Sequence, residues 1–112
     1  MKIPGAERAV LDAAKMRDYL LSREHAVGSA KARFFAQLGF SKENWTVLRN
    51  ALYGFASQDA QLGPATRFGQ KYLVHGTITG PSGRAGRIVV VWIILHGEDF
   101  PRFVTAYPGA AS

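Results

Sequence analysis

A short stretch in the first third of the chain combines residue types that could act on a phosphodiester. His25 lies in a loop-like segment, and Lys31 follows six residues later in the first turn of a predicted helix. Histidine exchanges protons near neutral pH, and helix N-termini are common sites of phosphate binding. Each residue also has an ordinary interpretation, because a loop histidine is often only exposed and a lysine can extend from an apolar stripe to solvent. The stretch therefore predicts either an anion site or a solvated surface.

The last predicted strand carries a second set of polar groups. In the segment RFVTAYP, strand alternation places Phe103, Thr105 and Tyr107 on one face and the intervening residues on the other. Two hydroxyl groups on one sheet face, next to a lysine and a histidine, could hold a phosphodiester by hydrogen bonds. Threonine and tyrosine are also favoured in strands for packing reasons alone, so plain β-propensity explains them equally well.

Several other chemistries have no support in the sequence. The chain has no cysteine, and its three histidines, His25, His75 and His96, do not have the spacing of metal ligands. No phosphate-binding loop, dinucleotide fingerprint or nucleophile elbow is present. The glycine-rich segment GPSGRAG joins two predicted strands and is typical of a hairpin connection. We therefore expect neither a metal ion nor an organic cofactor.

The elements that must position these residues form an α+β pattern. Apolar residues at helical spacing come first and period-two alternation follows, which predicts N-terminal helices packed on a C-terminal antiparallel sheet of three to four strands. Residues 58–69 are polar and turn-rich and are expected to form a loop. Helices are predicted over residues 13–21, 30–38 and 42–57, and strands over 70–79, 87–95 and 102–107. We expect one domain over residues 1–112, helical over about 12–57 and sheet-forming over about 68–107.

Composition bounds the class of protein and its partners. The 112 residues are 47% hydrophobic, carry a formal net charge of +6 and have a pI of about 10.1. A basic small domain favours polyanionic partners, although ordinary solubility explains the charge as well. The longest apolar run, residues 88–95, has strand length and is too short to span a bilayer. We expect a soluble protein that acts in the cytoplasm without a membrane partner, and the sequence leaves its oligomeric state open.

Two long segments carry a resemblance to a known family. The N-terminal segment KIPGAERAVLDAAKMRDYLLSREHAVGSAKARFFAQLGF and the C-terminal segment FGQKYLVHGTITGPSGRAGRIVVVWIILHGEDFPRFVTAY resemble the two halves of a bacterial domain family of unknown function. The resemblance covers about residues 2–107. The order of elements, ending in VTAYP, is similar to the barnase–EndoU–colicin–RelE (BECR) group of metal-independent ribonucleases, which includes many bacterial toxin modules.

The resemblance to BECR toxins implies an activity and a set of residues. It implies cleavage of RNA, with tRNA among the candidate substrates, through attack by the 2′-hydroxyl. His25 would be the acid or base, Lys31 the phosphate-stabilising cation, and Thr105 and Tyr107 would orient the phosphate. An acidic immunity protein or antitoxin would be the protein partner. We also expect five residues to contact the substrate: Arg33, Lys71, Tyr72, His75 and Arg102.

Two alternatives from other classes stay open. A non-catalytic module that binds nucleic acid or protein would have the same basic surface and would need neither His25 nor Lys31. A structural or immunity-type protein fits the positive charge less well. The chain begins with Met and has only a short lead, which favours a free-standing toxin of a toxin–antitoxin pair, and a module delivered by secretion as part of a larger toxin stays open as the alternative.

Overall fold

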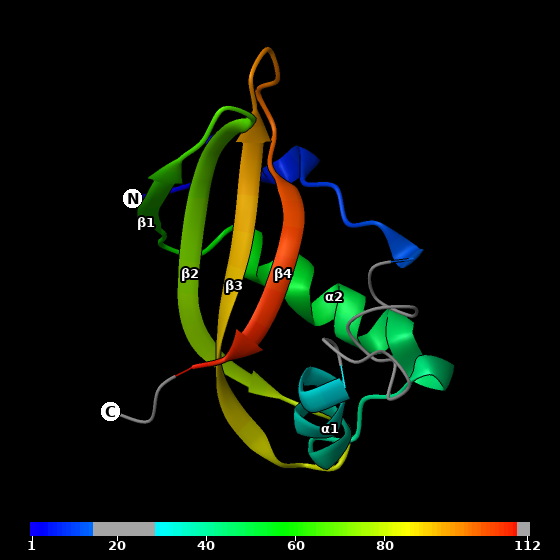
Figure 1. Ribbon diagram of the computed structural model, residues 1–112. Helices are drawn as coiled ribbons and strands as arrows, with labels where there is room; N and C mark the ends of the chain where they lie inside the picture. The colour runs from blue at the N-terminus through cyan, green and yellow to red at the C-terminus, as the bar shows by residue number, and fades with distance from the viewer. Residues whose placement is uncertain (15–28, 110–112) are drawn as a thin grey trace.

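A four-stranded antiparallel sheet forms most of the C-terminal half of the chain (Figure 1). The computed structural model describes residues 1–14 and 29–109. The sheet is a simple meander with the strand order β1-β2-β3-β4, and the predicted α+β fold is confirmed. The elements are η1 (Ala6–Arg8), α1 (Ser29–Gln37), η3 (Lys42–Asn44), α2 (Trp45–Ala56), β1 (Gln61–Ala65), β2 (Gly69–Thr79), β3 (Ala85–Leu95) and β4 (Arg102–Pro108).

The edge strand β1 lies inside the segment that the sequence predicted to be a loop. It contains Gly63 and Pro64, which disfavour a strand, and its pairing with β2 is irregular between Leu62 and Ala65. Proline is tolerated at a sheet edge because its missing N–H is not needed by a neighbouring strand. The prediction of a loop at this position was wrong because tertiary pairing overrides a weak local preference.

The core lies between the sheet and α2, which crosses behind the strands in Figure 1. Leu48, Leu52 and Phe55 are buried at helical spacing on α2, as the apolar periodicity predicted. One face of the sheet packs against them and includes Val74 on β2 and Trp92 on β3, both fully buried. At Gly76 an added Cβ would lie 2.6 Å from Phe55 Cε1, which places this face of β2 directly against the helix.

Helix α1 packs on the sheet near the end of β4 and beside the β2–β3 hairpin (Figure 1). The predicted apolar stripe is present, since Phe35 and Leu38 are buried and Phe34 is half-buried. Gly39 ends the helix with φ of +98°, as expected for a helix C′ glycine. The Ser82 amide of the hairpin donates a hydrogen bond of 3.0 Å to the Leu38 carbonyl. These contacts fix the direction from which α1 approaches the sheet.

The N-terminal segment runs from the edge strand β1 across to β4. Lys2 forms an isolated bridge with Asp59, and Val10 forms a parallel bridge with Arg102. The Val10 amide donates to the Pro101 carbonyl, and the Phe103 amide donates to the Val10 carbonyl, both at 2.9 Å. The start of β4 is therefore held on its outer edge. In the part of the chain that the structure describes, no helix is long and apolar enough to cross a membrane.

Candidate functional site

A β-bulge in β4 decides which side chains can form a site. Trp92 of β3 pairs with Phe103, while Val91 pairs with Thr105, so Val104 is the extra residue on β4. Phe103 is 5% exposed and its ring meets the Trp92 ring edge-on, with centroids 5.7 Å apart. The prediction that Phe103 shares a face with Thr105 was wrong, because the bulge adds one residue to the strand and breaks the simple alternation.

The structure brings Lys31 and Thr105 together from positions 74 residues apart. Lys31 Nζ on α1 donates a hydrogen bond of 2.9 Å to Thr105 Oγ1 on β4, and the contact is partly buried. Phe34 anchors the helix next to this lysine, since an added Cβ at Gly86 would lie 2.9 Å from the Phe34 ring. An ammonium group and a hydroxyl group side by side can both donate hydrogen bonds to a phosphate oxygen.

Strand pairing places several of the predicted residues on the sheet face turned away from α2. Residues that are directly opposite in an antiparallel pair point to the same side of the sheet. Three cross-strand rows result: Leu73–Val91–Thr105, His75–Val89–Tyr107 and Lys71–Ile93–Arg102. We call this surface the open sheet face because, among the residues that the structure describes, α2 packs on the opposite face. Val89 and Val91 on the open sheet face are buried, and its polar residues are Gln61, Lys71, His75, Thr77, Thr79, Arg87, Arg102, Thr105 and Tyr107.

The open sheet face is strongly biased toward positive charge. None of the four strands contains an aspartate or glutamate. Arg87, which the sequence analysis did not assign to the site, pairs with Thr77 and is exposed. The period-two alternation of β3 could have identified it, because Arg87 follows the same parity as Val89 and Val91. Tyr107 remains 36% exposed beside this basic surface.

The remaining predicted residues have different surroundings. Tyr72 is 8% exposed and belongs to the core, on the opposite face from Lys71 and His75, so its ring is not available to a substrate on the open sheet face. Arg33 is exposed on α1, two residues from Lys31. His25 lies outside the residues that the structure describes.

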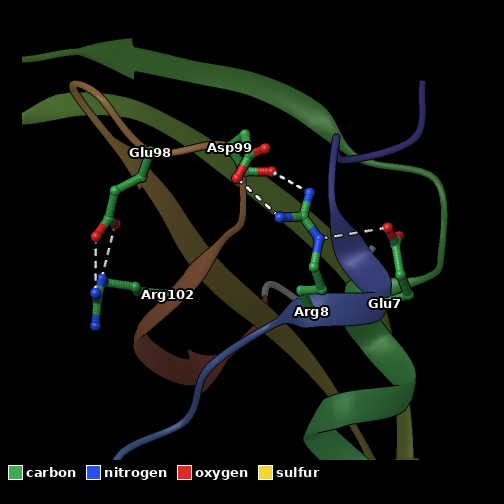
Figure 2. Close-up of polar contacts among 5 residues, drawn as sticks. All are labelled: Glu7, Arg8, Glu98, Asp99 and Arg102. Carbon is green, nitrogen blue, oxygen red and sulfur yellow. Dashed lines mark hydrogen bonds and ion pairs between the residues drawn. The ribbon is translucent and has the colours of Figure 1, made fainter.

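Two ion pairs hold the β3–β4 turn, residues 96–101, and both are drawn in Figure 2. Arg102 donates two hydrogen bonds of 2.8 Å to the Glu98 carboxylate, and these bonds hold the pKa of Glu98 below its usual value. Arg8 Nη1 donates at 2.8 Å to Asp99, and this contact likewise lowers the pKa of Asp99. Arg102 was predicted to contact substrate, but its guanidinium is already engaged by a carboxylate.

These ion pairs connect the N-terminal segment to the strand that carries Thr105. Arg8 also donates to the Asp99 backbone carbonyl at 3.1 Å, and an added Cβ at Gly5 would overlap that same oxygen. This connection cannot be predicted from local spacing, because Arg8 and Asp99 lie 91 residues apart and only the Glu98–Arg102 spacing is local. Within residues 1–14 and 29–109, no three His, Asp or Glu side chains are grouped to hold a metal ion.

Comparison with known proteins gives a similarity of fold to a solved structure and a match to a protein family. A chain of a contact-dependent growth inhibition toxin–immunity protein complex from Klebsiella pneumoniae 342 matches with a TM-score of 0.70 and 19% sequence identity, covering 89% of this chain and 99% of that chain. At this level of identity the match establishes a shared fold. No curated protein matches the sequence significantly. The family model described as domain of unknown function DUF6883 matches residues 2–110, and the chain therefore belongs to the DUF6883 family.

Proposed function

We propose that this chain is a toxin domain that cleaves RNA without a metal ion, in the manner of BECR ribonucleases. The hydrogen bond between Lys31 and Thr105 carries the proposal, because it places a cation and a hydroxyl group together beside a sheet face without acidic residues. The fold shared with a chain of a toxin–immunity protein complex supports the toxin class. The net charge of +6 suits an RNA substrate.

The proposed reaction uses the substrate's own nucleophile. The 2′-oxygen attacks the adjacent phosphorus, the bond from phosphorus to the 5′-oxygen breaks, and a 2′,3′-cyclic phosphate and a 5′-hydroxyl result. Negative charge builds up on the non-bridging oxygens during the attack. Lys31 and Thr105 would stabilise that charge, because preorganised donors are most effective where charge develops.

Two proton transfers complete the reaction. A base must take the proton of the 2′-hydroxyl, and an acid must give one to the departing 5′-oxygen. His25 is the proposed base or acid, on the sequence argument alone. Tyr107 is the proposed second group, since its ring is partly exposed and its position is two residues from Thr105. Its ring could instead stack on a base of the substrate.

The open sheet face would hold the RNA backbone. Lys71 and His75 on β2 lie next to Arg87 on the neighbouring strand β3, and neither strand carries an aspartate or glutamate. Arg33, exposed on α1, is a further candidate for the backbone. Such contacts make affinity fall with rising salt, by about one unit of log–log slope for each phosphate contacted.

A protein that cleaves cellular RNA needs an inhibitor in the cell that makes it. We propose a cognate immunity protein or antitoxin with an acidic surface that covers the open sheet face, because charge complementarity accelerates association and suppresses wrong partners. The site of action would be the cytoplasm that contains the RNA, reached by delivery into a target cell or by synthesis within it.

Induced expression in bacteria tests this proposal. The wild type is compared with Lys31→Ala, Thr105→Val and His25→Ala, and growth and total RNA are followed after induction. Growth arrest with fragmented RNA is expected from the wild type, with both effects lost in the Lys31 and Thr105 variants. Matched controls are Lys42→Ala, which removes one exposed positive charge, and Thr46→Val on α2, which removes one exposed hydroxyl outside the open sheet face.

The outcomes separate the alternatives. Folded variants that arrest growth as strongly as the wild type would exclude the Lys31–Thr105 site. A folded wild type that leaves RNA intact but binds it would favour the non-catalytic module. Protection of cells against a toxin, in place of toxicity, would identify the chain as the immunity type.

A further inference from the structure

The turn between β1 and β2 presents an exposed aromatic ring covered by a cation. Phe68 is 59% exposed, and the Arg67 guanidinium lies 4.9 Å from the centroid of its ring. A lone exposed phenylalanine is common on protein surfaces and carries no inference by itself. The combination with a stacked guanidinium matters, because both groups offer flat surfaces to a nucleic-acid base.

The turn is held rigidly in this arrangement. The Thr66 amide donates to the Gly69 carbonyl at 2.8 Å, and the Phe68 amide donates to Thr66 Oγ1 at 3.1 Å. The His96 amide at the end of β3 donates to the Phe68 carbonyl at 2.9 Å, and the His96 ring lies 3.3 Å from the Thr66 carbonyl. Phe68 is thus presented by a preorganised backbone, which lowers the entropic cost of binding a partner.

The surroundings favour an anionic partner for this ring. Neither β1 nor β2 contains an acidic residue, and Lys71 lies two residues into β2. The adjoining β3–β4 turn has two carboxylates, Glu98 and Asp99, and both are ion-paired with arginines. An RNA strand that stacks one base on Phe68 and extends its phosphates toward Lys71 would therefore meet positive charge.

We propose that Phe68 and Arg67, on a turn that His96 holds in place, form a stacking platform for one base of a single-stranded RNA, away from the cleaved bond. This inference rests on the proposed ribonuclease function. Leu73 on β2 and Thr105 on β4 both pair with Val91 on β3, so they lie at the same height in the sheet. Leu73 is four residues from Gly69 at the start of β2, which is about 13 Å along the strand at the rise of a β-strand. The platform therefore binds a nucleotide a short distance along the strand from the Lys31–Thr105 site.

Binding of a non-cleavable RNA tests the platform. Full-length protein is titrated into a fluorescein-labelled single-stranded RNA that is 2′-O-methylated at every ribose, and anisotropy is measured at several salt concentrations. Phe68→Ala is expected to weaken binding by about 5- to 100-fold, the range for loss of one stacked base. Phe68→Trp should restore the affinity. Leu62→Ala is the matched control, since Leu62 is 61% exposed on the same hairpin and belongs to neither site.

Two further readouts identify stacking as the cause. Phe68→Ala removes no charge and should leave the salt dependence unchanged, whereas Lys71→Ala should reduce the log–log slope by about one. An oligonucleotide lacking a single base at the platform position should bind the wild type more weakly than the intact one. Phe68→Ala should bind this oligonucleotide and the intact one with equal affinity.

Each contrary result has a distinct meaning. Equal affinities of Phe68→Ala and Leu62→Ala, with wild-type binding intact, would overturn the platform and leave the proposed function standing. Tight binding that depends on Phe68, without any cleavage of ordinary RNA, would support the platform and overturn the nuclease. Loss of an inhibitory protein partner in Phe68→Ala, with RNA affinity unchanged, would assign the ring to a protein interface and overturn the platform.

Discussion

Replacing Thr105 with valine measures how much the Lys31–Thr105 hydrogen bond contributes to the stability of the folded protein. Valine has nearly the shape of threonine and lacks the hydroxyl group that accepts the 2.9 Å hydrogen bond. Hydrogen bonds to charged groups contribute about 1.5–3 kcal/mol, and the partial exposure of this one favours the low end. We expect Thr105→Val to reduce the free energy of unfolding by about 1–1.5 kcal/mol.

A double-mutant cycle isolates the pair from the other interactions of Lys31. Lys31→Met removes the ammonium group and keeps most of the apolar stem, and Thr77→Val controls for the loss of an exposed hydroxyl on the same sheet. Unfolding by urea gives the four free energies, and we expect a coupling energy of about 1 kcal/mol between positions 31 and 105. A coupling below about 0.3 kcal/mol, within the usual error of additivity, would refute the claim that these groups are held together.

Three further predictions concern stability. Arg102 and Arg8 lower the pKa values of Glu98 and Asp99, so the stabilisation from these ion pairs is present at neutral pH and is lost as the pH falls through the lowered values. Glu98→Gln should therefore reduce the loss of unfolding free energy between neutral and acidic pH, measured by urea unfolding. An unchanged pH dependence would contradict the assignment. Gly80→Ala should destabilise the protein by about 1–3 kcal/mol, because an added Cβ would overlap the Leu38 carbonyl oxygen. Gly54→Ala on α2, where the Cβ meets nothing within 4 Å, should stabilise it by about 0.5–1 kcal/mol; thermal unfolding of both variants checks the contrast.

The helices and the central strands follow from local patterns in the sequence. The stripe at Phe34, Phe35 and Leu38 and the glycine at position 39 predicted α1. Alternation predicted β2, and a run that is apolar on both faces predicted β3. The predicted helix over residues 13–21 lies mostly outside the residues that the structure describes. The predicted third helix, 42–57, is present as η3 followed by α2. These elements could be predicted because their signals repeat every two or every three to four residues and agree with their burial.

The features that the sequence did not reveal depend on contacts between distant segments. β1 exists because β2 offers it a partner, despite Gly63 and Pro64. The bulge at Val104 sends Phe103 into the core, and alternation along a single strand cannot predict an extra residue. The bond between Arg8 and Asp99 joins positions 91 residues apart, a distance over which no spacing rule applies.

The residue types of the candidate site could be predicted from the sequence, but only part of its geometry could. Lys31 was a candidate because it is a cation at the start of an apolar stripe. In the structure its ammonium group reaches β4, which explains its position on the helix. Tyr72 was predicted to contact the substrate, but the strand parity that it shares with Val74 places it in the core. The cross-strand rows that gather Lys71, His75 and Tyr107 required the register of three strands, which composition does not provide.

Cleavage of RNA by the purified protein tests the central claim most directly. The wild type is incubated with RNA in excess EDTA, and the products are analysed for their ends. We predict 2′,3′-cyclic phosphate and 5′-hydroxyl ends, no cleavage where the 2′-hydroxyl is replaced by hydrogen, and loss of activity by about 100-fold or more in folded Lys31→Ala, the scale of a lost oxyanion-type donor. Intact RNA with a folded wild type, or equal cleavage by Lys31→Ala, would contradict the assignment of this site.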